Sequence, residues 1–163
     1  MPAVRPRKDI ARGCGDTVIR KYRPEDCDEV LSVWAAASEL AHPFLSEAFL
    51  EGERREIRNV HLPKAETWVW EAGGRVVGFI SLLGNEVGAV FVDPSFQRSG
   101  IGRTLMDHAK ALRGRLEVEV FRDNVVGRSF YARYGFEPIL KKVHEPTGME
   151  VVRLRLAPQE VSS

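Results

Sequence analysis

The stretch from Glu86 to Phe121 constrains the fold of this chain more than any other. An apolar run typical of a strand, EVGAVFVD, is stopped by Pro94, and the loop PSFQRSGIGRTL leads into a helical pattern. The apolar face of that pattern consists of Ile101, Leu105, Ala109 and Leu112. A second strand-like run, RLEVEVF, follows directly. Two strands joined through a helix are expected to pair in parallel, because only a long crossover can connect parallel strands.

The remaining patterns predict antiparallel strands and more helices. TVIRKY and the two C-terminal runs FEPILKKV and MEVVRLRL are typical of strands, and ETWVWE and RVVGFISLL flank AGG as a hairpin. Helices are expected from Pro24 to Ala41, from a Ser46 cap to an end at Pro63, and from Asn124 to Tyr134. Gly135 would cap the last of these.

This order predicts an α+β fold with three layers, αβα. A mixed, mostly antiparallel central sheet would carry helices on both faces. The length of 163 residues fits one domain. We expect residues 1–16 to be a disordered leader, residues 17–156 to form the single domain, and residues 157–163 to be a tail.

Composition excludes several classes of function. The chain has 24 Lys and Arg against 23 Asp and Glu, a net charge of +1, so no basic surface for nucleic acid is expected. Cys14, Cys27 and the four histidines lack the spacing of a zinc site, so no metal is expected. No apolar run reaches the length of a membrane span, and the N-terminus has no apolar core of a secretory signal. These features predict a cytoplasmic protein without a membrane partner.

The glycine loop has the chemistry of a phosphate site. Gly100 and Gly102 fall at the start of the predicted helix, where unpaired amides and the helix dipole favour an anion. Arg98 and Arg103 add positive charge. The loop lacks the Gly-Lys-Ser/Thr ending of a nucleotide P-loop, and Leu105 stands where a dinucleotide fingerprint needs a third small residue. A phosphate or pyrophosphate site and an ordinary glycine turn both remain open on this evidence.

Two motifs together resemble the GNAT acetyltransferase superfamily. The first is Gln/Arg-x-x-Gly-x-Gly/Ala, which is matched in full by Gln97, Gly100 and Gly102. The second is an Asn, then a Tyr, then Gly-Phe, which is matched by Asn124, Tyr131 and the pair 135–136. The resemblance extends from Thr17 to Leu156, and AHPFL and TWVWE are similar to a group of small bacterial members.

The resemblance implies acetyl-coenzyme A as the acetyl donor and the loop as the site of its pyrophosphate. The strand before the loop would pair with the pantetheine arm, and one of its amides would polarise the thioester carbonyl. Asn124 would contact coenzyme A near the second helix. The cofactor-binding residues implied in this way are Val90, Phe91, Val92, Gln97, Arg98, Ser99, Gly100, Ile101, Gly102, Arg103 and Asn124.

The resemblance also implies a proton donor. Tyr131 matches the tyrosine that protonates the leaving thiolate in the family, and a phenol is a donor at neutral pH. The alternative is packing, because Phe130, Tyr134 and Phe136 are close in sequence. Helical phase places Phe130 with Val126 on an inner stripe and Tyr131 a step round the helix.

The sequence does not single out one residue as the general base. Glu119 and Glu117 lie on one face of their strand. Glu119 resembles the glutamate at that place in the ribosomal-protein N-terminal alanine acetyltransferases, but both residues are equally compatible with a solvated surface. A water relay is a further alternative. His42, in the turn after the first helix, would line the acceptor cleft and take a proton near neutral pH, or be incidental.

These observations predict an N-acetyltransferase that transfers acetyl to a primary amine by direct attack in a ternary complex. The acceptor is either a small molecule or a protein lysine or N-terminus. The alternatives are a sensor that binds acyl-CoA without turnover, against which Tyr131 argues, and a GNAT protein acting on aminoacyl-tRNA, against which the net charge argues. The chain would be a monomer or a homodimer, the latter paired through MEVVRLRL as an exposed edge.

Overall fold

The computed structural model describes residues 17–157. The expected leader, and the tail from residue 158, lie outside the described residues. The strands are β1 (Thr17–Lys21), β2 (Glu66–Ala72), β3 (Arg75–Leu83), β4 (Glu86–Val92), β5 (Leu116–Phe121), β6 (Glu137–His144) and β7 (Met149–Leu156). The helices are α1 (Cys27–Ala41), α2 (Glu47–Glu56), α3 (Leu62–Lys64), α4 (Ile101–Arg113) and α5 (Val125–Tyr134).

All seven strands belong to one sheet in the order β1-β2-β3-β4-β5-β7-β6. Every pair is antiparallel except β4 and β5, which run parallel across the α4 crossover. The sequence predicted a mixed, mostly antiparallel sheet but not the order of its strands, and both the element order along the chain and the parallel pair are confirmed.

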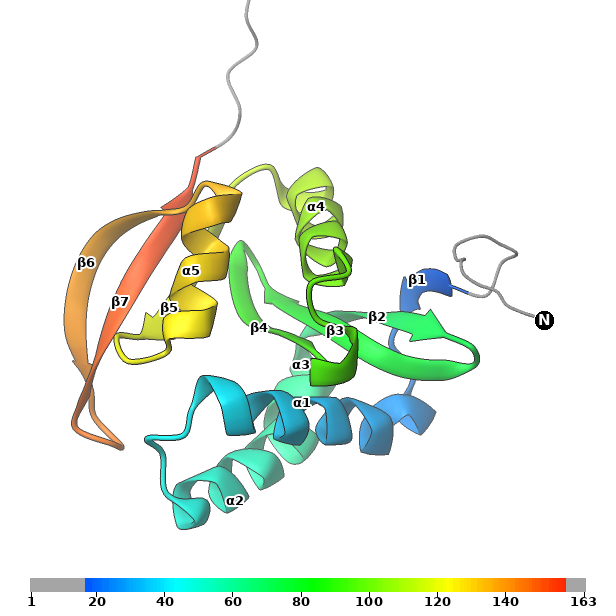
Figure 1. The fold of residues 1–163 in the computed structure, drawn as a ribbon, viewed down its shortest axis with the longest axis horizontal. Coiled ribbons are helices and arrows are strands. Elements are labelled where there is room, and N and C mark those ends of the chain that lie inside the picture. Colours follow the sequence, from blue (N-terminus) through cyan, green and yellow to red (C-terminus); the bar gives the residue numbers. More distant parts are fainter. Residues whose placement is uncertain (1–16, 158–163) are drawn as a thin grey trace, which may run out of the picture.

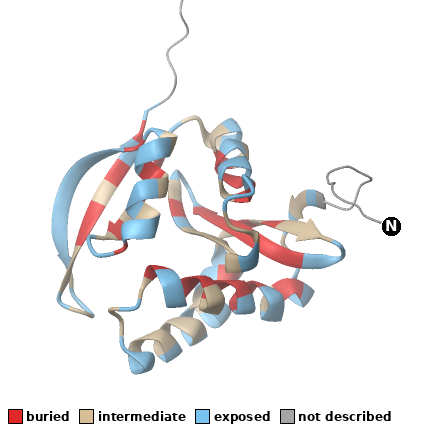
Figure 2. Cartoon of the chain, viewed as in Figure 1, coloured by how far each residue is buried: buried red, intermediate tan, exposed pale blue. Residues whose placement is uncertain are grey.

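The helices cover both faces of the sheet, which confirms the three-layer design (Figure 1). On one face, α4 and α5 close a core that includes Leu105, Met106 and Tyr131. On the other face, α1 and α3 pack against β2 and β3 through Val30, Trp34, Leu62 and Phe79. Figure 2 shows that buried positions line the inner side of α1 and the central strands, whereas β6 is exposed along most of its length.

The parallel pair is short, and this shapes the molecule. Only Glu86 with Glu117 and Val87 with Val118 are in register, and beyond them β4 continues on β3 alone. The register between β3 and β4 shifts at this point, so that Gly88 is an extra residue on β4. A bulge of this kind bends a strand and increases its twist. The bend carries the end of β4 away from β5 and opens the sheet between them.

Two details differ from the sequence-based expectation. Pro63 does not end the second helix, because the chain passes through a π-helical turn at Ile57–His61 and continues as α3 to Lys64. At this end of the sheet the edge strand is β6 rather than β7, because the final hairpin folds back and inserts β7 between β5 and β6. MEVVRLRL is therefore not an exposed edge that a second chain could pair with, since both sides of β7 are already paired.

Within residues 17–157, none of the helices combines the length and the apolar character that a membrane crossing requires.

Candidate active site

A cavity of about 1030 Å³ occupies the opening between β4 and β5. Its walls come from the ends of these two strands, from the glycine loop and start of α4, and from α5 on one face of the sheet. On the other face, α1 contributes Trp34, the loop after α1 contributes His42, and α2 contributes Leu50. The cavity thus reaches through the sheet, and two reactants can approach its centre from opposite faces.

The glycine loop is held in place by its own polar groups. Gly100 has a left-handed φ of 88° and precedes the first residue of α4, a conformation that glycine adopts without steric cost. The side-chain amide of Gln97 donates to the Val92 carbonyl (3.1 Å), which ties the loop to the end of β4. The Ser99 hydroxyl donates back to the Phe96 carbonyl. The loop is therefore fixed before any ligand binds.

The start of α4 offers an anion site. The amides of the first helical turn have no partner within the helix, and the first intrahelical bond runs from Thr104 N–H to the Gly100 carbonyl (3.0 Å). A Cβ on Gly102 would lie 3.3 Å from the Phe130 ring, so glycine lets α4 approach α5 closely there. Arg103 lies 5.6 Å from the centre of the Tyr134 ring, and Tyr134 donates to Asp107 Oδ1 (2.5 Å). This stacking holds a guanidinium beside the unpaired amides.

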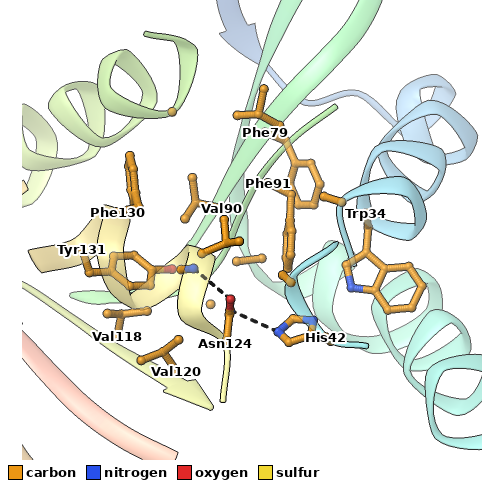
Figure 3. A pocket seen from close by; sticks show the side chains of 18 of the residues that line it. Trp34, His42, Phe79, Val90, Phe91, Val118, Val120, Asn124, Phe130 and Tyr131 are labelled. Atoms are coloured by element: carbon orange, nitrogen blue, oxygen red, sulfur yellow. Dashed lines mark hydrogen bonds between the residues drawn. The ribbon is translucent and has the colours of Figure 1, made fainter. Parts of the chain in front are cut away.

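Asn124 joins the two walls of the cavity. It is the N-cap of α5, and its Oδ1 accepts a hydrogen bond from Gly127 N–H (2.8 Å). Because this bond fixes the amide orientation, Nδ2 faces His42 Nε2 at 3.4 Å (Figure 3). An amide NH₂ only donates, so His42 accepts at Nε2 and carries its proton on Nδ1. The loop after α1 is thereby linked to the helix that carries Tyr131.

His42 lines the cavity, which was one of the two alternatives that the sequence left open, but it does not titrate near neutral pH. Burial lowers the pKa of His42 to about 4. Its Nε2 lone pair is also engaged by Asn124. His42 is therefore a neutral hydrogen-bonding group in the wall rather than a base for neutral solution.

Tyr131 is the buried residue of α5. Figure 3 shows its ring reaching from α5 with the hydroxyl directed into the cavity, beside Phe130 and Val118. Burial raises the pKa of Tyr131 well above its usual range, so the phenol stays protonated at neutral pH. This hydroxyl is therefore available as a proton donor at the centre of the cavity.

Glu119 lies on the opposite face of β5 from Val118 and Val120 and also lines the cavity. Its Oε2 is 2.7 Å from Lys142 Nζ and 3.1 Å from an Arg153 guanidinium nitrogen. Burial of the carboxyl raises the pKa of Glu119, but these two cations outweigh burial and bring the pKa below its usual value. Glu119 is thus ionised at neutral pH, and the same Arg153 also pairs with Glu117 (2.8 Å).

A chain of aromatic rings borders the cavity on the α1 face, and the sequence analysis did not find it. His42 contacts Phe44 and Phe121, and Phe121 in turn contacts His144, with ring centres 5.1 to 5.8 Å apart. Phe49 packs edge-on to His144 (6.0 Å). The rings come from the α1–α2 loop, α2, β5 and β6. Of these rings, only Phe121 could have been placed from the sequence, because strand alternation puts it on the same side of β5 as Glu119.

The structure brings almost all of the sequence-predicted residues around this cavity. Twelve of the thirteen line it, and the exception is Ser99, whose hydroxyl points back into the loop. The residues that line it are Val90, Phe91, Val92, Gln97, Arg98, Gly100, Ile101, Gly102, Arg103, Glu119, Asn124 and Tyr131. Across the part of the chain that is described, no group of three His, Cys, Asp or Glu residues is arranged to hold a metal ion.

The sequence of this chain is similar to those of known acetyltransferases. Residues 63–138 match the family model for the acetyltransferase (GNAT) domain. The peptidyl-lysine N-acetyltransferase YiaC of Escherichia coli (strain K12) is 31% identical over 120 residues, which is 73% of this chain and 82% of that protein.

Two solved structures share the fold. The solution structure of the apo form of YjaB from Escherichia coli superposes with a TM-score of 0.77 at 28% identity and covers 85% of this chain and 96% of that one. The PaiA N-acetyltransferase of Thermoplasma acidophilum, solved in complex with coenzyme A, gives a TM-score of 0.70 at 22% identity, with 84% and 97% covered.

The neutral state of His42 predicts a pH dependence of stability. An unfolded histidine has a pKa of about 6.5, and the native pKa is about 4, so between these values the unfolded state binds more protons and stability falls as pH falls. We expect His42 to make the free energy of unfolding about 2 kcal/mol lower at pH 5 than at pH 7.

Urea unfolding of the wild type and His42→Gln at both pH values measures this effect. The variant should lose about 2 kcal/mol less than the wild type over this interval, because glutamine does not titrate. Equal losses in the two proteins would show that His42 is not held neutral by the fold.

Proposed function

Since this chain belongs to the GNAT acetyltransferase family and is an N-acetyltransferase, we propose that it transfers acetyl from acetyl-coenzyme A to the side-chain amine of a lysine in a protein or peptide. The observation that carries the proposal is the cavity through the opened sheet. An anion site and the Tyr131 hydroxyl lie on its α4–α5 side, and the Glu119 carboxylate lies on the other face of β5.

The donor would bind at the glycine loop and extend along β4. Unpaired amides at the start of α4 and the charges of Arg98 and Arg103 suit a pyrophosphate. Beyond Val87, β4 has no partner on the β5 side, so its backbone can pair with the amide groups of an extended arm. These features fit coenzyme A, and the residues of the loop and of β4 are the ones we assign to it.

The reaction has three needs, and the chain supplies a group for each. A lysine ammonium has a pKa of about 10.4 and must lose a proton before it attacks the thioester carbonyl. The oxyanion of the tetrahedral intermediate needs an N–H donor, which a backbone amide of Val90–Val92 on the side of β4 that faces β5 can provide. The leaving thiolate gains a proton, for which the Tyr131 hydroxyl is our candidate.

Glu119 is our candidate for the proton acceptor. Its carboxylate is ionised, lines the cavity and lies within reach of an ammonium that enters from the open face of β5. The nitrogen becomes more acidic as its bond to carbon forms, so a carboxylate in contact with it can take the proton that leaves. His42 is not our choice, because its pKa of about 4 and its bond to Asn124 leave it a poor acceptor.

Two observations favour lysine in a polypeptide as the acceptor. The relative at 31% identity bears the name peptidyl-lysine N-acetyltransferase. In this chain, Glu53 and Glu119 line the cavity and can attract a cationic side chain, while the rings of His42 and Phe121 can pack on its methylene groups. The comparisons favour neither a non-catalytic sensor nor an enzyme acting on aminoacyl-tRNA.

The acceptor is tested with a panel of amines at fixed acetyl-coenzyme A. We expect thiol release with peptides that carry an internal lysine and a blocked N-terminus, and little release when that lysine is replaced by arginine. Free polyamines and peptides with only a free N-terminus should be poor acceptors. Turnover restricted to either of the latter would overturn the assignment to lysine and leave the acetyl transfer itself intact.

The role of Tyr131 is tested by Tyr131→Phe. This change removes only the hydroxyl, so packing in the buried site is retained, and we expect kcat to fall by about 100-fold or more with the affinity for acetyl-coenzyme A unchanged. Phe130→Leu is the matched control, since it alters packing on the neighbouring residue without removing a proton donor. A Tyr131→Phe variant with full turnover would remove Tyr131 from the mechanism.

The role of the loop is tested by Gly100→Trp, measured by calorimetric titration with acetyl-coenzyme A. No heavy atom outside the neighbouring residues lies within 4 Å of a Cβ at this position, so a side chain here starts in open space, and we expect the bulk of an indole to cover the anion site. We expect no measurable binding.

Gly100→Ala is the control, because it imposes the same cost of about 1 kcal/mol for a left-handed residue without the bulk. It should retain most of the affinity, and thermal melting should show both variants folded. Unchanged affinity in Gly100→Trp would refute the assignment of the loop to the donor.

A further inference from the structure

On the face of the sheet that carries Glu119, the ammonium group of a lysine of the same chain contacts the Glu119 carboxylate. Lys142 of β6 places its Nζ 2.7 Å from Glu119 Oε2. The helices α1, α2 and α3 pack mainly on β2, β3 and β4, and the α1–α2 loop and α2 reach β5 and β6 through Phe44 and Phe49, which contact Phe121 and His144. Glu119 and Lys142 are not fully covered, since the side chain of Glu119 remains 25% exposed and that of Lys142 54% exposed.

The strand register explains why Lys142, and not its neighbour, reaches the carboxylate. Lys142 pairs with Val151, and Val151 pairs with Phe121, so all three lie on the face that carries Glu119. Lys141 pairs with Val152, and Val152 belongs to the core beneath α4 and α5. The two lysines are therefore adjacent in sequence and lie on opposite faces of the sheet.

The contact has the features expected for a bound acceptor. A primary ammonium on a flexible chain of methylene groups meets the carboxylate that we assign as proton acceptor, and that carboxylate lines the cavity assigned to the donor. We propose, on the basis of the proposed function, that Lys142 is an acetyl acceptor of its own chain, modified in cis at Nζ. Lys142 would then occupy the position that a substrate lysine takes during turnover.

The second cation on Glu119 does not compete for this role. Arg153 also contacts Glu119 Oε2 and is anchored by Glu117 (2.8 Å) and Glu86 (3.4 Å). A guanidinium remains protonated in proteins and is not a nucleophile, so Arg153 can only hold the carboxylate in place. An exposed ion pair such as that of Lys142 is worth about 0–1 kcal/mol, so little opposes the movement of Lys142 from the carboxylate to the donor.

The proposed step is balanced with the donor of the main reaction. The Lys142 ammonium gives one proton to solvent water, and the Nζ lone pair of the resulting amine forms a bond to the thioester carbonyl carbon. The bond from that carbon to sulfur breaks, and the thiolate of coenzyme A takes a proton from Tyr131. Glu119 takes the second proton from the nitrogen and passes it to water, and the Tyr131 phenolate regains a proton from water, so one proton is released overall. The products are Nε-acetyl-Lys142 and free coenzyme A.

The test is mass mapping of the full chain incubated with acetyl-coenzyme A, in the presence of a lysine peptide acceptor. Cleavage after glutamate does not occur at the Glu-Pro bonds that follow residues 137 and 145, so it yields the peptide from Val120 to Glu150, which contains both lysines, and its fragment ions locate the acetyl group. We expect Lys142 to be modified at least about tenfold faster than Lys141, because the contact with Glu119 raises its effective concentration at the cavity. The rate constant should not change with protein concentration.

Matched variants separate transfer by this site from chemical acetylation. Glu119→Gln and Tyr131→Phe should both reduce acetylation of Lys142 to the level of Lys141, and Lys142→Arg should abolish it while keeping the charge. A measurement without donor tests the contact itself. In nitrogen NMR spectra of lysine ammonium groups, the Lys142 signal should be visible through slowed proton exchange and should be lost in Glu119→Gln.

The outcomes distinguish this inference from the proposed function. Acetylation at Lys142 that depends on Glu119 and Tyr131 supports the inference. Turnover of the peptide with Lys142 modified no faster than Lys141 overturns the inference and leaves the proposed function standing. Acetylation of Lys142 without peptide turnover supports the inference and overturns the peptide acceptor, and absence of both reactions overturns both.

Discussion

The separation of β4 from β5 is the constraint on which the site depends. The two strands share only two register pairs before the bulge at Gly88 bends β4 away. A sheet that stayed paired to the ends of both strands would satisfy more backbone groups, but it would leave no passage between its two faces. The opening costs ladder hydrogen bonds and leaves unpaired backbone beside the cavity, and such groups need a partner when water is excluded. An extended ligand arm can supply it, so the same feature that weakens the sheet favours donor binding.

Charge and hydrogen bonding keep the two sides of the opening in a fixed relation. On the side of α4 and α5 the partial charges are positive, because the amides of α4 and Arg103 gather there. On the other face of β5 stands the Glu119 carboxylate. Between them, Asn124 caps α5 and contacts His42, so a shift of the α1–α2 loop would also disturb the helix that carries Tyr131. The neutral His42 suits this position, since a protonated ring would turn a second donor toward the Asn124 NH₂ group.

The sequence predicted the parts of this site that are local. The strand, the glycine loop and the helix start follow one another in one continuous stretch of sequence, and the parallel pair follows from the crossover.

The predicted inner face of α5 was wrong, because Tyr131 is buried and Val126 is about half exposed. The helical repeat of so short a helix does not say which face meets the sheet. The expectation that MEVVRLRL forms an exposed edge was also wrong, because the position of β7 depends on which strand of the final hairpin pairs with β5. The aromatic chain and the contact of Lys142 with Glu119 depend on four segments far apart in sequence, and no single pattern contains them.

The state of Glu119 follows from a balance between burial and paired cations. Burial alone would raise the pKa of a carboxyl in the wall of a cavity. A carboxylate with a raised pKa is a stronger base, but a smaller fraction of the carboxyl groups is then ionised. Lys142 and Arg153 reverse that shift and keep the carboxylate charged. Arg153 is anchored by two further glutamates, whereas Lys142 is held by Glu119 alone among the described residues. When Lys142 leaves, the carboxylate loses one cation and becomes a stronger proton acceptor. An incoming ammonium therefore meets a carboxylate that is fully charged on arrival, and the carboxylate gains basicity as that ammonium gives up its proton.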